Sequence, residues 1–112
     1  MIYLASPYTH PDLAVMEDRF DKMCRVAGAY MKQGIIVYSP IVHCHPIAVR
    51  VDLPRDWEFW KKFDTETVLA SKMVHVIKLP GWETSKGIAA EVKIAQDAGI
   101  PVLYVDPVNL LP

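Results

Sequence analysis

The stretch Pro-Gly-Trp-Glu-Thr-Ser-Lys-Gly-Ile-Ala-Ala-Glu at residues 80–91 holds the side chains best suited to chemistry. It follows a short β-branched apolar run at residues 73–77 and opens an amphipathic segment that ends at Gly99. This pattern predicts a buried strand, a turn and the start of a helix. Thr84 or Ser85 suits the N-cap, and the free N–H groups of a helix's first turn bind anions such as phosphate. Ser85 would add a hydroxyl group to that anion site.

A carboxylate, Glu91, lies further along the same predicted helix. Because helical side chains lean toward the N-terminus, Glu91 should reach back over the turn that contains Gly87. Gly inside a helix costs about 1 kcal/mol relative to Ala, so Gly87 suggests that a ligand or a neighbouring strand approaches the backbone closely. The alternative for Glu91 is a solvated helix residue beside Lys86 or Lys93.

Composition restricts the class of protein. The chain has 112 residues, 52% of them hydrophobic, so we expect one compact domain over residues 1–112 and no second domain. The 12 Lys and Arg nearly balance the 13 Asp and Glu, which argues against a nucleic-acid polymer as partner. The sequence shows no signal-peptide pattern and no apolar run of about 18 residues, so we expect a cytoplasmic protein without a membrane partner.

The cysteines and histidines do not predict a metal site. Cys24 and Cys44 form no CxxC pair and are read as reduced thiols. His43, Cys44 and His45 are consecutive, so an extended segment cannot turn all three toward one ion, and the spacing of zinc ligand pairs is absent. We expect His43 and His45 to contact a substrate or to pack in a lid.

The rest of the chain alternates strands and helices. We predict strands at residues 2–5, 35–38, 73–77 and 100–105. A first helix is predicted at residues 12–33, with Gly34 at its end. A second helix begins at residues 54–56 with Asp56 as its cap, and the third is the helix already described. Residues 39–53 contain two prolines and no clear period, which predicts a long loop that acts as a lid or binding loop.

This alternation predicts an α/β fold: a small doubly wound parallel sheet, Rossmann- or flavodoxin-like, with four strands in the order 2-1-3-4 and helices around it. In such sheets, ligands bind beyond the carboxyl ends of the strands where the winding reverses, which here is between the first and third strands. The first strand leads into Ser6, Pro7 and Tyr8, and the third leads into the turn with Trp82. Both loops should therefore meet Glu91 at one crevice and supply substrate contacts.

The helix that begins near residue 56 has a polar residue in an unexpected place. Its apolar stripe runs through Trp57, Trp60 and Val68, and Asp64 lies on the same stripe. Asp64 is either a site carboxylate or a polar residue at the stripe's edge. Trp57, Trp60 and the nearby Phe63 either join the core or form a dimer face.

Together these residues resemble the nucleoside 2-deoxyribosyltransferase superfamily. The matching pattern is Ile-Tyr-Leu-Ala-Ser-Pro at residues 2–7, Asp64 on a middle helix, and Ser85-x-Gly87-x-x-x-Glu91 before an Ile-Pro-Val strand. In that family the Glu matching Glu91 attacks the anomeric carbon of the sugar. The Tyr matching Tyr3 orients this Glu, and the Asp matching Asp64 lies near the sugar and the base.

The residue six positions before the nucleophile separates two branches of that superfamily. Transferases that pass the sugar to a second base commonly have Asp there, whereas this chain has Ser85. Ser resembles the branch that hydrolyses 2′-deoxynucleoside 5′-monophosphates, in which it binds the 5′-phosphate; a carboxylate at a helix N-terminus would repel that phosphate. Ala89 departs from this branch, which often has a second Gly there. Ser6 either contacts phosphate or sugar or shapes its turn.

The resemblance implies hydrolysis of the N-glycosidic bond of a nucleoside 5′-monophosphate through a Glu91 glycosyl-enzyme ester. It also implies that no cofactor is needed and that the protein is a homodimer or a larger homo-oligomer. Two carboxylates in one pocket push their pKa values apart, which favours Glu91 as nucleophile and Asp64 as acid. Base exchange, a non-catalytic nucleotide-binding or sensing domain, and a structural subunit are the alternatives.

Overall fold

The computed structural model describes residues 1–110 as an α/β fold built on one parallel sheet. Its four strands, in the order β2-β1-β3-β4, are β1 (Ile2–Ala5), β2 (Val37–Tyr38), β3 (Met73–Ile77) and β4 (Val102–Val105). Ile2 pairs with Val37 on one side and with Met73 on the other, so β1 is an inner strand. The predicted fold class and strand order are confirmed.

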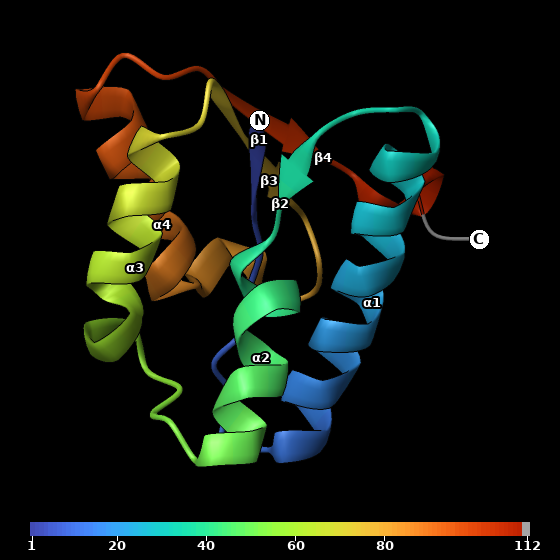
Figure 1. Ribbon diagram of the computed structural model, residues 1–112, viewed down its shortest axis with the longest axis vertical. Helices are drawn as coiled ribbons and strands as arrows, with labels where there is room; N and C mark the ends of the chain where they lie inside the picture. Colours follow the sequence, from blue (N-terminus) through green and yellow to red (C-terminus); the bar gives the residue numbers. More distant parts are fainter. Residues whose placement is uncertain (111–112) are drawn as a thin grey trace.

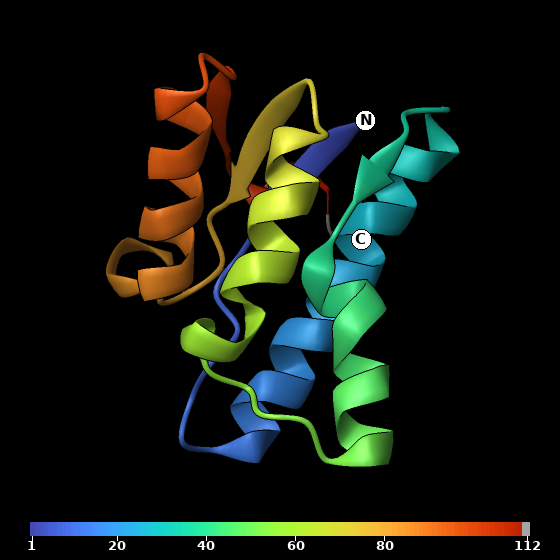
Figure 2. The ribbon, with the colours of Figure 1, turned by 60° about the vertical axis from the view of Figure 1, so that its left-hand side comes forward.

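Helices cover both faces of the sheet (Figures 1 and 2). One face carries α1 (Leu13–Lys32) and α2 (Pro40–Val51), and the other carries α3 (Trp57–Leu69) and α4 (Lys86–Asp97). Two short 3-10 helices, η1 (Trp82–Thr84) and η2 (Pro107–Asn109), follow β3 and β4. Among residues 1–110, no helix is both long enough and apolar enough to cross a bilayer.

Alternate residues of β1 belong to two separate cores, because successive side chains of a strand point to opposite faces. Ile2 and Leu4 pack with α1 and α2, whereas Tyr3 and Ala5 pack with α3 and α4. Every residue of β1 is buried. This placement puts the side chain of Tyr3 on the same face of the sheet as α4.

The prediction of a loop over residues 39–53 is wrong, because most of this segment forms α2. Ser39 caps the helix by accepting a hydrogen bond from the Val42 N–H, and Pro40 occupies the first turn, where a missing N–H costs nothing. Pro46 lies inside the helix, and its carbonyl accepts a hydrogen bond from Arg50 at 3.1 Å.

The periodicity of α2 was hidden by a polar residue in its buried stripe. Ile41, His45 and Ala48 are the buried residues of this helix and recur at spacings of four and three, as expected for an amphipathic helix. Because His45 and two prolines interrupt the apolar pattern, the sequence alone suggested irregular structure. The segment is therefore a helical wall and not the predicted loop.

Most other predicted boundaries shift by one or two residues. Asp12 caps α1 by accepting from the Ala14 N–H, and Gly34, with φ of 75°, directly follows the C-cap. β2 is shorter than the predicted residues 35–38, although the Ile36 carbonyl still accepts a hydrogen bond from Ile2. Asp56 occupies the N-cap position of α3, but its side chain makes no capping hydrogen bond.

Candidate active site

The carboxyl ends of β1 and β3 open into a cavity of about 730 Å³. Its walls are the loop after β1, the N-terminal half of α2, the start of α3 and the N-terminus of α4. The predicted site residues in these walls are Ser6, Pro7, Tyr8, His45, Asp64, Ser85, Gly87 and Glu91. The volume lies within the range of pockets that hold nucleotide-sized ligands. The cavity occupies the point where the winding of the sheet reverses, as expected.

Glu91 is a buried carboxyl group at the base of this cavity. It is 3% exposed, and the Tyr3 hydroxyl donates a hydrogen bond to its Oε2. Lys93 instead pairs with Asp97 at 3.0 Å, so the alternative of a solvated Glu91 neutralised by that lysine does not hold. The side chain thus reaches back from α4 to β1, as the lean of helical side chains predicts.

Asp64 projects from α3 to the same place and is coupled to Glu91. Both carboxyl groups are buried and share a hydrogen bond. Burial raises the pKa of Asp64 to about 6. Burial also raises the pKa of Glu91 well above its ordinary value; the charge of Asp64 adds to this effect, and the Tyr3 hydrogen bond only partly offsets it.

The two acids therefore hold one proton between them near neutral pH. Glu91 is the more buried of the two, so it carries this proton in the free protein while Asp64 is ionised. Burial, followed by the charges of Glu91 and Asp64, raises the pKa of Tyr3 well above its ordinary value. Tyr3 consequently stays a neutral phenol that can donate to a carboxylate but cannot itself act as a base.

The N-terminus of α4 forms another wall. Ser85 is the N-cap, and its Oγ accepts a hydrogen bond from the Ile88 N–H at 3.2 Å, as predicted. A Cβ added at Gly87 would lie 3.8 Å from the Trp57 ring and 3.9 Å from Ser85 Oγ, which are ordinary contacts. No strand presses on Gly87, so the structure does not support a neighbouring strand as the reason for this glycine, and a ligand in the cavity stays a prediction.

Ser6, in the loop after β1, is a wall residue with a polar atom that lacks a partner among the described residues. Its side chain is only 9% exposed, and its Oγ makes no hydrogen bond within residues 1–110. A buried hydroxyl that lacks a partner costs about 1–3 kcal/mol, so such atoms are uncommon unless a ligand or water satisfies them. Ser6 and Ser85 are thus both wall residues with a hydroxyl group, and Ser85 caps a helix whose first N–H groups have no partner within the helix.

Two arginines in the walls were missed by the sequence reasoning. Arg19 donates hydrogen bonds to the carbonyls of Tyr8, Thr9 and Pro80, and so ties the loop after β1 to the loop after β3. Arg55 lies in the segment before α3, and its Nε is buried without a partner among the described residues. Neither residue stands in a recognisable motif, and only the three-dimensional fold brings both to the cavity.

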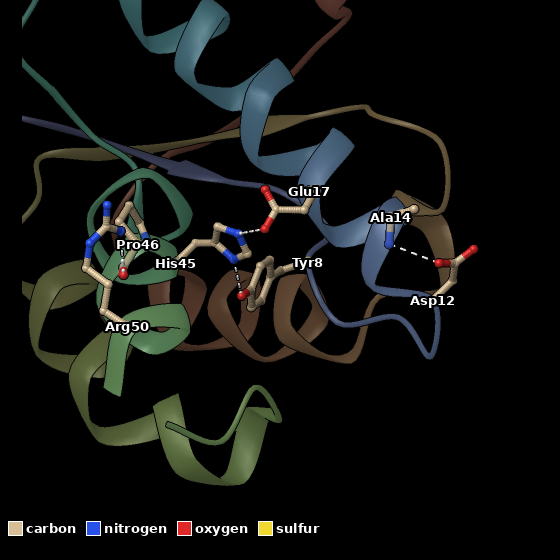
Figure 3. A network of polar contacts seen from close by, with 7 residues as sticks. All are labelled: Tyr8, Asp12, Ala14, Glu17, His45, Pro46 and Arg50. Carbon is tan, nitrogen blue, oxygen red and sulfur yellow. Dashed lines mark hydrogen bonds and ion pairs between the residues drawn. The ribbon is translucent and has the colours of Figure 1, made fainter. Parts of the chain in front are cut away.

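A second polar cluster, shown in Figure 3, reaches the cavity wall at Tyr8 and His45. The Tyr8 hydroxyl lies 2.5 Å from His45 Nδ1, and His45 Nε2 lies 2.8 Å from Glu17 Oε1. His45 is 4% exposed, whereas Glu17 on α1 is exposed. The sequence suggested Tyr8 and His45 as site residues but gave no reason to connect either with Glu17.

Two predicted substrate contacts lie outside the cavity walls. His43 is exposed on α2 with its ring 6.0 Å from that of Tyr38, because two residues along a helix place it on the face opposite to that of His45. Trp82 turns away to pack against Tyr104, with ring centroids 5.6 Å apart. In their place, Trp57 and Trp60 contribute aromatic surface to the cavity.

Comparison with known families places the chain. Residues 1–106 match the family described as "Domain of unknown function (DUF1937)", and the chain belongs to this family. No curated protein matches the chain. The description of this family names no activity.

Proposed function

We propose that this DUF1937 protein hydrolyses the N-glycosidic bond of a nucleoside 5′-monophosphate and releases the free base and a sugar phosphate. The observation that carries the proposal is the buried group of Tyr3, Glu91 and Asp64 at one end of a nucleotide-sized cavity. A nucleophilic carboxylate and a nearby acid are the groups that glycosidic cleavage requires. The resemblance to the hydrolase branch of the nucleoside 2-deoxyribosyltransferase superfamily supports the same reaction.

In the proposed complex, the 5′-phosphate lies at the N-terminus of α4 between Ser85 and Ser6. The helix N–H groups and both hydroxyls would then donate to phosphate oxygens. The sugar would pass over Gly87, where the missing side chain leaves room for C1 to approach Glu91. The base would extend toward Trp60 and Tyr8, whose rings line the rest of the cavity.

In the first step, Glu91 attacks the sugar and the proton shared by the acid pair is transferred to the departing base. As the Glu91 carboxylate bonds to C1, the bond from C1 to the base nitrogen breaks, and the proton released by Glu91 passes through Asp64 to the departing base. Tyr3 keeps its hydrogen bond to Glu91 and holds the carboxylate in position. Because Glu91 is buried and held by Tyr3, its carboxylate would be preorganised to stabilise the positive charge that develops on the sugar.

Water completes the reaction. Asp64, ionised after the first step, accepts a proton from a water molecule whose oxygen bonds to C1, and the ester bond to Glu91 breaks. The sugar phosphate leaves with a hydroxyl group at C1. The proton on Asp64 is again shared with Glu91, so the pair returns to its starting state and no cofactor is consumed.

The test is to incubate the protein with each ribonucleoside and deoxyribonucleoside 5′-monophosphate and to measure free base by chromatography. We expect base release from at least one monophosphate, slower release from the matching nucleoside without phosphate, and none with a Glu91→Ala variant. Adding a second free base distinguishes base exchange, which would then outpace hydrolysis. Nucleotide binding that survives Glu91→Gln without any base release by the native protein would indicate a sensing domain.

We also propose that the protein is a cytoplasmic homo-oligomer. Both cysteines are free thiols, which suits a reducing compartment. Phe59, Trp60 and Phe63 cluster on α3 with ring centroids 4.9–5.7 Å apart, and Phe63 is exposed. Aromatic clusters of this kind are enriched at interfaces. Sedimentation that shows only monomer at micromolar concentration would contradict the oligomer.

A further inference from the structure

The cluster of Tyr8, His45 and Glu17 takes no part in the reaction proposed above. It begins at the cavity, where Tyr8 and His45 are wall residues, and ends in solvent at the Glu17 carboxylate (Figure 3). His45 is buried between the other two residues and its ring is 4.7 Å from that of Phe20, so the imidazole is fixed in place. The geometry therefore determines which atom of each hydrogen bond in the cluster is the donor.

Each hydrogen bond in this cluster has a defined direction. A carboxylate can only accept, so His45 Nε2 must carry a hydrogen that it donates to Glu17. In its neutral form the His45 imidazole has one N–H group, which leaves Nδ1 as an acceptor. The Tyr8 hydroxyl, 2.5 Å away, then donates its only hydrogen to Nδ1.

Tyr8 holds that hydrogen firmly. Burial raises the pKa of Tyr8, and the positive charge of Arg55 and a hydrogen bond from its guanidinium only partly offset this effect. The phenol is therefore neutral, with its single hydrogen committed to His45. The Arg55 guanidinium donates to one lone pair of the Tyr8 oxygen, so toward the cavity this oxygen can offer its remaining lone pair but no hydrogen.

We propose that Tyr8 determines base specificity by accepting a hydrogen bond from an exocyclic amino group, so that bases such as adenine or cytosine are preferred. A base with a carbonyl oxygen at the same place would set two acceptors against each other. This inference rests on the proposed function, because it assumes that the base occupies the Tyr8 end of the cavity. Tyr8 does not touch the bond that breaks, so its effect is on which nucleotide binds.

Matched ligand pairs test this proposal. Calorimetry at about pH 8, on the full chain with Glu91→Gln to prevent turnover, compares deoxyadenosine 5′-monophosphate with its analogue that lacks the 6-amino group. The corresponding cytosine nucleotide is compared with its analogue that lacks the 4-amino group. We expect the amino member of at least one pair to bind about tenfold more tightly, the effect of one well-formed hydrogen bond.

Tyr8→Phe in the same background should reduce that preference to about twofold or less and leave binding of the amino-free analogue unchanged. Tyr104→Phe is the matched control, because Tyr104 is exposed and packs on Trp82 outside the cavity. Equal affinity within both pairs, or a preference that survives Tyr8→Phe, would overturn the proposal. If none of the nucleotides binds, the proposed function fails and this inference fails with it.

A surface substitution tests the direction of the hydrogen bonds without disturbing the cavity. Lysine can only donate, so Glu17→Lys would make His45 Nε2 the acceptor and Nδ1 the donor to Tyr8. The Tyr8 hydrogen would then be free to point into the cavity. The preference should shift by about fivefold or more toward hypoxanthine over adenine monophosphates. Because Glu17 is exposed, the variant should fold normally, and an unchanged preference would contradict the proposed hydrogen-bond order.

Discussion

The two polar clusters of the cavity use similar residues in opposite surroundings. Each joins a tyrosine hydroxyl, a carboxyl group and one further ionisable side chain. Tyr3, Glu91 and Asp64 are all buried, and two of them are acids with raised pKa values. The other cluster leads through His45 to an exposed carboxylate, and its polar atoms are paired.

The acid pair lowers the stability of the fold, whereas the cluster around His45 does not. Two buried acids that cannot both ionise reduce the free energy of unfolding at neutral pH, and a fold retains such a pair where chemistry uses it. A buried imidazole with both nitrogens hydrogen-bonded holds its neighbours in place without this cost. The first cluster is thus suited to reaction and the second to recognition, and substitutions should affect them with opposite signs.

The largest expected effect comes from the proposed nucleophile, Glu91. Glu91→Gln preserves shape and can still accept the Tyr3 hydrogen bond, but an amide does not form the ester. Base release at saturating nucleotide should fall at least about a thousandfold, while nucleotide affinity stays within a few-fold. Glu83→Gln, an exposed acid in the turn before α4, is the matched control. A Glu91→Gln variant that keeps a tenth of native activity would contradict the proposal that this cluster carries out the reaction.

The second acid should come next in magnitude. Asp64→Asn removes the group that relays the proton to the base, so kcat should fall by about 10² to 10⁴. In the native protein, kcat/KM should rise as the pH increases through about 6, where Asp64 ionises and can accept the proton of Glu91. This inflection should vanish in Asp64→Asn and persist in Glu66→Gln, an exposed acid on the same helix.

The same substitution should stabilise the fold. The Asp64 pKa rises from 3.8 to about 6 in the folded protein, so the folded state binds this proton more tightly than the unfolded chain. The stability contributed by the protonated form is complete below about pH 4 and is lost as the pH rises through about 6. Urea unfolding at about pH 8 should therefore show Asp64→Asn more stable by about 1–3 kcal/mol, with the gain vanishing near pH 4. Destabilisation at the higher pH would argue against a strained acid pair.

The smallest effect, with the opposite sign, should come from the recognition cluster. Glu17→Gln weakens a charge-assisted hydrogen bond to His45 at the surface and should lower the free energy of unfolding by less than about 1 kcal/mol. The same urea experiment measures it. An increase in stability comparable to that of Asp64→Asn would show that both clusters are strained and that the contrast is mistaken.

The sequence predicted the parts of the fold that depend on local pattern. The β-branched run of β3, the Ser85 cap and the alternation of strands and helices led to the observed strand order. Glu91 could be placed near β1 because the lean of a helical side chain and the winding of a parallel sheet are general. The family resemblance, and not the local pattern, pointed to Tyr3 as its partner, and the Tyr3 hydroxyl donates a hydrogen bond to Glu91.

Features that depend on tertiary contacts could not be predicted. α2 was missed because a buried imidazole, satisfied by partners on two other segments, occupies a position where the pattern calls for an apolar residue. Arg19 reaches the cavity because carbonyls from two separate loops accept its hydrogen bonds. His43 lies outside the cavity wall because α2 is a helix, which the sequence did not reveal. Trp82 lies outside the wall because it packs on Tyr104.

Carbon-13 NMR of selectively labelled aspartate and glutamate carboxyl groups tests most directly whether the acid pair shares one proton. Following the Asp64 and Glu91 signals over about pH 3 to 9 gives the titration of each group, with the exposed Glu83 and Glu66 as internal references. We predict one step near pH 6, dominated by Asp64, and a Glu91 signal that remains protonated well above the range of the two references. Titration of both groups together with the exposed glutamates would contradict the shared proton and the mechanism built on it.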